Sequence, residues 1–226
     1  VSSPQQDGRP TSRGPGERAG LTAERILRAA RVTADRDGVE ALSMRRLASE
    51  LGVAPNSLYS HYPDKATLLD ALFDSLLAEV DIDGLGELAP RDGLRRLMVD
   101  ARELLVSHSG FLPQLLSRPM RGPNASRLAE ETLALLARLG AEGPAAVDAL
   151  RILLTYAFGA AAMDAPRSQE PDPQGRWAAS EEAFGGRADL PHVAEQARAL
   201  ARPSDASVFT DGIDWLLDGI ERRAKA

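Results

Sequence analysis

The chain has 226 residues, of which 43% are hydrophobic and 27% charged, as is ordinary for a globular protein. It has no cysteine, which excludes disulfides, thiol catalysis and cysteine-ligated metals. Its net charge of −6 argues against a simple polycationic nucleic-acid binder. No stretch approaches the ~18 apolar residues of a membrane span, and the start of the chain lacks the apolar core of a signal peptide. We therefore expect a cytoplasmic protein without a membrane partner, and we interpret the longest uncharged run, 152–163, as a buried helix.

Residues 1–20 are rich in proline and glycine and almost free of apolar side chains, which predicts a disordered N-terminal arm. Basic arms of this kind can reach phosphates or a minor groove, and three arginines here are able to do so, Arg9, Arg13 and Arg18. An unstructured tail with incidental charge is the simpler interpretation.

Four short helices are predicted between residues 21 and 80. The first begins after Thr22, whose hydroxyl can cap it, and ends at Gly38. Two more lie within 43–61, and the fourth begins after Asp64, another good cap. The fourth helix carries apolar residues at helical spacing, namely Leu69, Leu72, Phe73, Leu76 and Val80.

The stretch 43–61, SMRRLASELGVAPNSLYSH, is typical of two helices joined by a tight turn. Ser43 can cap the first helix, and Gly52 follows its last apolar residue, where a left-handed backbone is common. Pro55 suits the first turn of the second helix, which should end before Pro63. The pattern predicts a helix–turn–helix, whose second helix usually enters the major groove of DNA.

The second of these helices displays polar and aromatic side chains. Leu58 is its only large aliphatic residue and should hold it against its own domain. The outward-facing set is predicted to be Asn56, Ser57, Tyr59, Ser60 and His61, residue types that can contact base edges or phosphates. In the alternative, Tyr59 and Tyr62 pack inward and His61 is merely solvated. Residues 1–65 carry ten Lys/Arg against eight Asp/Glu, whereas residues 66–226 carry seventeen against twenty-five, so the positive excess lies with this motif.

Beyond residue 80, apolar periodicity predicts helices near 91–107, 111–117, 125–139, 144–163, 192–201 and 205–223. The segment from Pro166 to Pro191 is rich in Pro, Gly, Ser and charge, which predicts a long connection that is functional or mobile. Trp177 within it is either a lid residue or a loop anchor. No strand pattern persists, so the expected fold class is all-α, with an N-terminal three-helix helix–turn–helix module followed by a larger helical domain.

Residues 21–80 closely resemble the DNA-binding domain of TetR-family regulators. The resemblance rests on the helix–turn–helix, on an L-Y-x-H-Y segment, and on the D-K-x-x-L-L opening of the fourth helix. LSRPM at 116–120 and FTDGIDWLLDGIERR at 209–223 are similar to segments of the tetracycline-repressor type of C-terminal domain. The resemblance implies a homodimeric repressor that binds a palindromic double-stranded DNA operator through residues 21–80. A small-molecule inducer would then bind residues 81–226 and release the operator.

In this family the DNA contacts come from the end of the second helix to the start of the fourth. The matching positions are Arg45, Asn56, Ser57, Tyr59, His61 and Lys65. The best-known repressors have proline and threonine where this chain has Asn56 and Ser57, which leaves the operator sequence open.

The resemblance also bears on the ligand. Tetracycline repressors bind a magnesium–drug chelate with a histidine shortly before a T-R-P segment, which Arg118 and Pro119 match. The histidine position is Gln114, a poorer ligand for a hard cation, so we expect no metal-chelate inducer, no metal site and no cofactor. His108 nearby is more simply a capping or surface residue.

Candidate ligand-pocket residues lie on the helices between 91 and 163. They are Arg102, Leu105, Phe111, Gln114, Leu115, Tyr156, Phe158 and Met163. Arg102, if it points inward, would suit an anionic or carbonyl-rich ligand. The alternative for each apolar member is ordinary core packing.

The resemblance further implies dimerisation through the helix over 144–163 and the last helix, which would form a four-helix bundle from two subunits. Small residues would allow close approach, and Trp215 would be an aromatic anchor. The expected interface comprises Gly159, Ala160, Trp215, Leu216, Leu217 and Ile220. A competing interpretation places Trp215 inside its own subunit.

A ligand-binding protein or enzyme built on the same scaffold is the alternative function. The three histidines, His61, His108 and His192, have no Ser, Cys or acid arranged in a recognisable catalytic constellation. No Gly-rich phosphate loop or metal-spaced cluster is visible either. We therefore expect no enzymatic activity.

Overall fold

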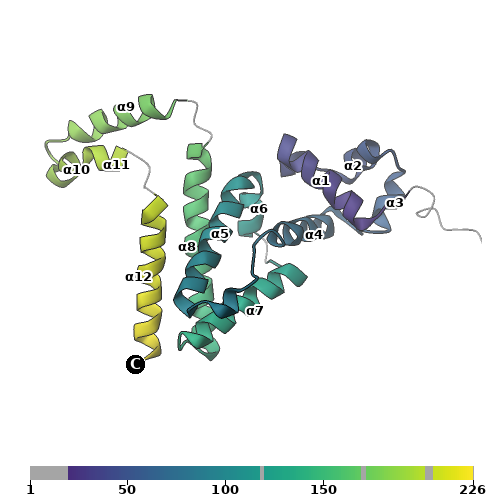
Figure 1. Ribbon diagram of the computed structural model, residues 1–226. Helices are drawn as coiled ribbons and strands as arrows, with labels where there is room; N and C mark the ends of the chain where they lie inside the picture. Colours follow the sequence, from purple (N-terminus) through teal and green to yellow (C-terminus); the bar gives the residue numbers. More distant parts are fainter. Residues whose placement is uncertain (1–19, 118–119, 169–171, 202–205, 226) are drawn as a thin grey trace, which may run out of the picture. The chain divides into compact units, whose positions relative to one another are not determined.

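The computed structural model describes residues 20–117, 120–168, 172–201 and 206–225, and within these ranges it contains helices and no strand (Figure 1). The predicted all-α fold class is therefore confirmed. The predicted N-terminal arm and the Arg118–Pro119 pair lie outside the described residues. The chain divides into two compact units, Val1–Leu72 and Phe73–Ala226, and the division falls inside helix α4 (Lys65–Leu77). The boundary near residue 80 that the sequence suggested stays a prediction.

The helices of the first unit begin and end where their capping residues predict. α1 (Ala23–Asp37) begins after Thr22, whose Oγ1 accepts a hydrogen bond from the Arg25 N–H at 3.1 Å. α2 (Met44–Leu51) begins after Ser43, whose Oγ accepts from the Arg46 N–H at 3.2 Å. A single 3₁₀ turn over Val39–Ala41 joins the two. These caps confirm the sequence-based helix starts.

The turn between α2 and α3 (Pro55–Tyr59) also follows the prediction. Gly52 has φ +68° and ψ +33°, the left-handed conformation that an L side chain rarely adopts. Pro55 occupies the first turn of α3. The Asp64 carboxylate then accepts a hydrogen bond from the Thr67 N–H at 2.7 Å, which caps α4 as expected.

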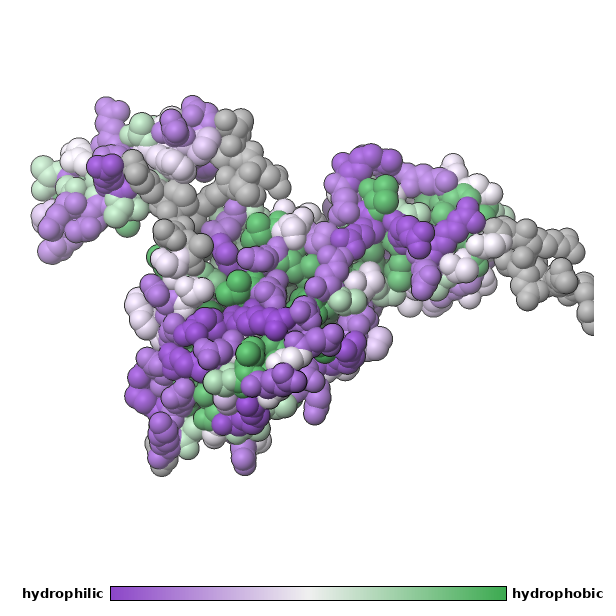
Figure 2. Space-filling view, viewed as in Figure 1, coloured by the Kyte–Doolittle hydropathy of each residue, from purple (hydrophilic) through white to green (hydrophobic). Residues whose placement is uncertain are grey.

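The second unit is built around α5 (Pro90–Ser107), which packs against α7 (Pro123–Arg138), α8 (Gly143–Ser168) and α12 (Ala206–Ala224). The short helix α6 (Leu112–Ser117) packs against α8. Large side chains from these helices fill the core, among them Leu94, Leu97, Met98, Leu135, Leu153 and Ile213. On the face shown in Figure 2, hydrophilic residues cover most of this unit, and apolar residues are exposed in small separate patches.

Helix α8 is apolar on most of its surface but buried on one face only, which corrects the interpretation of 152–163 as a buried helix. Leu153, Ala157 and Ala161 are buried, whereas Ile152 and Met163 are exposed. Within the described residues, Gly143–Ala165 is long and apolar enough to cross a membrane by length and composition alone. A core helix passes the same test, and α8 packs against α5, α7 and α12.

The segment between Pro166 and Pro191 is largely helical, so the long connection predicted there is wrong. α8 continues to Ser168, and α9 (Pro173–Gly185) follows. Asp172 caps α9 by accepting a hydrogen bond from the Gly175 N–H at 3.0 Å, and Pro173 lies in its first turn, where proline is tolerated. Trp177 is therefore a half-buried helix residue and not a loop anchor. α9 packs against α10 (Pro191–Glu195) and α11 (Ala197–Ala201), the two short helices that replace the single helix expected over 192–201.

Candidate DNA-binding and ligand-binding sites

Two buried side chains fix the orientation of α3. Leu58 is fully buried, as the sequence predicted, and Tyr62 just after the helix is 7% exposed. Burial raises the pKa of the Tyr62 phenol, because the charged form is poorly solvated there. Tyr59 lies on the other side and is 46% exposed. Tyr62 therefore packs inward, as the alternative interpretation held. Tyr59 does not, so that interpretation is wrong for Tyr59.

The six residues expected to contact DNA lie on α2, on α3, in the turn that follows α3, and at the start of α4. Arg45, Asn56, Tyr59 and His61 are exposed. Ser57 and Lys65 are half-buried, and the Ser57 carbonyl accepts a hydrogen bond from the Ser60 hydroxyl at 2.7 Å. The first unit thus presents an arginine, an amide, a phenol and an imidazole to solvent on consecutive elements of the helix–turn–helix.

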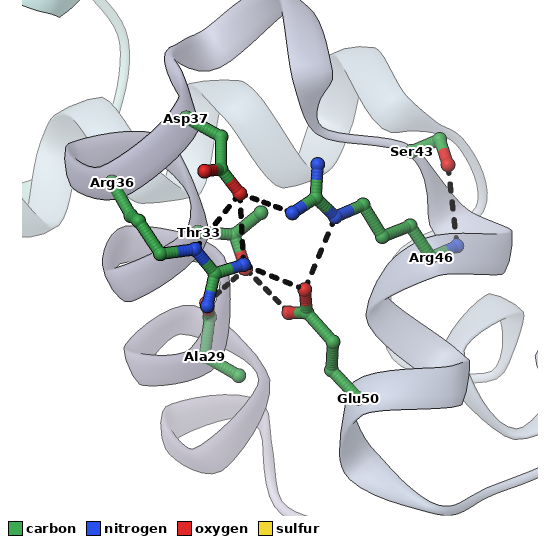
Figure 3. A network of polar contacts seen from close by, with 7 residues as sticks. All are labelled: Ala29, Thr33, Arg36, Asp37, Ser43, Arg46 and Glu50. Carbon is green, nitrogen blue, oxygen red and sulfur yellow. Dashed lines mark hydrogen bonds and ion pairs between the residues drawn. The ribbon is translucent and has the colours of Figure 1, made fainter.

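A polar network that the sequence did not reveal ties α1 to α2 (Figure 3). Glu50 is its centre: one carboxylate oxygen accepts from the Thr33 hydroxyl at 2.5 Å, and the other from Arg36 Nη2 and Arg46 Nε, both at 3.1 Å. Asp37 pairs with the same two arginines. The Thr33 hydrogen bond is the main cause that lowers the pKa of Glu50, and the Arg36 hydrogen bond is the main cause for Asp37. The network fixes α2 against α1. Helix α2 in turn packs against α3, the second helix of the helix–turn–helix, which we call the reading helix.

The second unit contains an apolar cavity of about 90 Å³. Its walls come from α5, α7 and α8, and Leu77 at the end of α4 and Val80 just beyond it close one side. Leu105 and Phe158, both expected in a ligand pocket, line it. Among the described lining residues, Thr132 alone is polar.

A second, larger cavity of about 610 Å³ lies along α8 and α12. It contains three more of the expected pocket residues, Arg102, Tyr156 and Met163. Arg102 donates to Asp164 Oδ2 from Nε and Nη2 at 3.0 and 2.5 Å, and its guanidinium carbon lies 5.0 Å from the centre of the Phe209 ring. The Tyr156 ring stacks on Phe209 with centroids 5.1 Å apart, and burial raises the pKa of its phenol.

Of the remaining pocket candidates, Phe111 and Leu115 are not among the described residues that line either cavity. Phe111 is 1% exposed and packs edge-on against Phe73, with centroids 5.8 Å apart, so it is a core residue. Leu115 is also buried in the core, and the side chain of Gln114 lies outside what the structure describes. His108 occupies the C-cap of α5, as one interpretation held, but it is mostly buried, with Nε2 3.5 Å from Glu79 Oε2.

The residues expected at a dimer interface differ in exposure. Trp215 is 74% exposed, which rules out the interpretation that it packs inside its own subunit. Gly159 is exposed, and Ala160, Leu216 and Ile220 are half-buried. Leu217 is fully buried within its own subunit, so it cannot contribute surface to a partner. It differs from Leu216 and Trp215 because successive residues of a helix point in different directions.

A buried carboxylate, also not apparent from the sequence, links the end of α4 to α7. Asp74 is 8% exposed and accepts hydrogen bonds from the backbone N–H groups of Asn124 at 3.3 Å and Ala125 at 2.9 Å. Asn124 Nδ2 also donates to it at 2.9 Å. The acid therefore caps α7, the helix that forms one wall of the apolar cavity.

A helix–turn–helix with an exposed reading helix, joined to a helical unit that encloses an apolar cavity, defines a ligand-responsive DNA-binding transcriptional regulator. The family model for "Bacterial regulatory proteins, tetR family" matches residues 26–72, and that for "Tetracyclin repressor-like, C-terminal domain" matches residues 87–224. The chain belongs to the tetR family of bacterial regulatory proteins.

Relatives and solved structures agree with this assignment. The transcriptional repressor DrrR1 of Streptomyces coeruleorubidus is 33% identical, over 95% of this chain and 82% of its own length. The class A tetracycline repressor of Escherichia coli is 30% identical, over 90% of this chain and 92% of its own. The structure of ActR from Streptomyces coelicolor with actinorhodin has a TM-score of 0.83 and 25% identity, covering 92% of this chain and all of that one.

Proposed function

We propose that this regulator is a repressor that binds a palindromic operator as a homodimer and leaves it when a small molecule binds the second unit. The observation that carries the proposal is the exposed reading surface of α3, which Leu58 and Tyr62 hold in place from below. DrrR1 and the class A protein are both named as repressors, which supports repression over activation. Because a repressor must reach its operator DNA, we also propose that the protein lies in the cytoplasm.

The proposed DNA contacts are Arg45, Asn56, Ser57, Tyr59, His61 and Lys65. Asn56 is able to pair with adenine through two hydrogen bonds, and Tyr59 and His61 are able to reach base edges or phosphates. Arg45 and Lys65, one on each side of α3 in the chain, suit phosphates, which fix the register of the protein on the duplex.

Exposed apolar residues on α8 and α12 support the homodimer. Ile152 and Met163 on α8 are 47% and 62% exposed, and Val208 and Trp215 on α12 are 48% and 74% exposed. Large apolar side chains on adjacent packed helices are typical of a surface that a second copy covers. Two reading helices must then lie roughly 34–36 Å apart to enter successive major grooves.

The apolar cavity supports release by a ligand. Leu77 at the end of α4 lines it, and the other end of α4 begins at Lys65, six residues after the last residue of α3. A ligand that prefers a different position of α4 shifts the population away from the DNA-binding state by its difference in affinity for the two states. The structure of ActR is a complex with actinorhodin, which supports a small-molecule ligand for this chain as well.

The test is selection of bound sequences from random duplex DNA by the purified full chain. We expect enrichment of a palindrome whose half-sites lie about one helical turn apart. Tyr59→Ala and His61→Ala should each weaken binding to that palindrome by about 5- to 150-fold, because a lost base contact costs about 1–3 kcal/mol.

Val32→Ala is the matched control, since Val32 is 57% exposed on α1 and outside the proposed contacts. Equal affinity of all four proteins would overturn the contact assignment. No enriched sequence at all would favour a ligand-binding protein on this scaffold that has lost operator binding.

A further inference from the structure

We infer that the ligand of the apolar cavity is an uncharged, predominantly hydrocarbon molecule. This inference rests on the proposed function, because it names the chemistry of the ligand that the regulator would sense. It concerns the cavity enclosed by α5, α7, α8 and the end of α4, and it follows from the walls of that cavity.

Among the residues that the structure describes, the cavity walls offer almost no polar group. Apart from Thr132, every described lining residue is Ala, Leu, Val, Met or Phe. The hydroxyl of Thr132 already donates to the Leu128 carbonyl at 2.6 Å, so it can offer a ligand only an acceptor. A ligand hydroxyl or N–H could use that acceptor, whereas a carbonyl or carboxylate would find no donor on it.

A charged ligand would lose its hydration without compensation. Arg102, the cation that the sequence offered for a ligand pocket, lines the other cavity and is held there by Asp164 at 2.5 Å and by the Phe209 ring. Burying an ion without a partner costs several kcal/mol after relaxation. The anionic ligand that an inward-pointing Arg102 would have suited is therefore disfavoured in this cavity.

The volume of the cavity limits the size of a ligand that can enter without movement of the walls. A dry protein cavity of about 150 Å³ lined by Leu, Ile and Phe binds benzene, and this cavity is about 90 Å³. A single aromatic ring therefore enters only if the flexible Leu and Met side chains of the walls move to enlarge the cavity. Larger ligands must displace residues of the walls, because protein interiors have little spare volume.

The test measures the thermal unfolding of the full chain with two probes of the same ring, toluene and benzoate. Toluene should raise the unfolding temperature in a concentration-dependent way, because a ligand that binds only the folded state stabilises it. Benzoate at the same free concentration should give no shift. Isothermal titration calorimetry should give a dissociation constant for toluene that is at least tenfold lower than that for benzoate.

Ala129→Leu assigns the binding to this cavity. Ala129 lines the cavity on α7, and a leucine there fills the space, so the toluene shift should disappear. Ala134→Leu is the matched control, the same substitution at an exposed position of the same helix, and should keep the shift. If Ala129→Leu does not fold, Ala101→Leu on the α5 wall replaces it.

Benzoate binding as tight as toluene, or a toluene shift that survives both filling variants, would overturn the inference. Operator release is measured separately, with the palindrome from the selection. If toluene binds in the cavity and the operator stays bound, the ligand class stands and the proposed release mechanism fails. If the operator is bound and neither probe binds, the ligand class fails and the operator-binding function stands.

Discussion

Asp74 illustrates how one buried carboxylate supports an entire helix. It accepts hydrogen bonds from two backbone N–H groups at the start of α7 and from the Asn124 side chain. Gly122 just before α7 has φ +138°, and a Cβ there would lie 2.3 Å from Asp74 Cγ. The glycine is thus required both by its backbone conformation and by the close approach of the acid.

Asp74→Ala is expected to lower the free energy of unfolding by about 2–3 kcal/mol, because it leaves the N-terminal donors of α7 without their cap in a buried site. Denaturant unfolding can follow the second unit by the fluorescence of its two tryptophans, Trp177 and Trp215, at a fixed protein concentration. Glu130→Ala on the exposed face of α7 is the control and should change stability by less than about 0.5 kcal/mol. Equal effects of both changes would contradict the capping role.

Contacts between residues close in the sequence could be predicted, whereas contacts between residues far apart in the sequence could not. The caps Thr22, Ser43 and Asp64 were predictable, because each bonds a backbone N–H three residues ahead. Asp74 and Ala125 are 51 positions apart, and no local pattern pairs them. Arg102 was predictable as an unusual polar residue on a core helix, but which cavity it enters depends on Asp164, 62 positions away.

At the scale of elements, periodicity predicted helices over most of the chain and failed where proline was taken as a breaker. Pro173 begins α9 instead of preventing it, because proline at the first helical turn loses no hydrogen bond. Periodicity also identifies an apolar helix without saying what covers each face. For that reason Leu217 and Trp215, two positions apart on α12, were assigned to one interface although one is buried and the other exposed.

The network between α1 and α2 makes the stability of the first unit depend on pH. The pKa values of Glu50 and Asp37 are lowered in the fold, so their contribution is present above the ordinary carboxylate pKa of about 4 and is lost as pH falls through the lowered values. Hydrogen exchange of α1 and α2 amides, corrected for intrinsic rates, should show protection that falls below about pH 4.

Glu50→Gln should reduce this protection at pH 7 and flatten its decline in acid, because the centre of the network no longer titrates. Glu24→Gln changes an exposed carboxylate on α1 outside the network and should leave the decline intact. A wild-type decline that Glu50→Gln does not flatten would assign the acid sensitivity to other groups.

At the scale of the whole molecule, we expect operator binding to depend on the assembly of two copies. A single reading helix of five residues contacts too few bases to select a site alone. The first unit carries only a small positive excess, so its affinity for phosphates is modest. Two copies joined through α8 and α12 would double both contributions, and the affinity for a palindrome should therefore depend on the integrity of that face.

Trp215→Glu should convert the dimer to a monomer and weaken palindrome binding at least tenfold, while leaving the helix content unchanged. A carboxylate in the centre of an apolar interface would be desolvated without a partner, whereas in the monomer the position is 74% exposed and accepts a charge readily. Sedimentation velocity at micromolar concentration measures the assembly, and circular dichroism checks the fold.

Leu200→Glu is the matched control, because Leu200 is a large apolar residue that is 54% exposed on α11, a helix that is not part of the proposed interface of α8 and α12. It should remain dimeric and keep its affinity for the palindrome. A dimeric Trp215→Glu protein with full affinity would move the interface off this face. A monomeric one that still binds the palindrome with full affinity would instead separate operator binding from dimerisation, because each half-site would then be read independently.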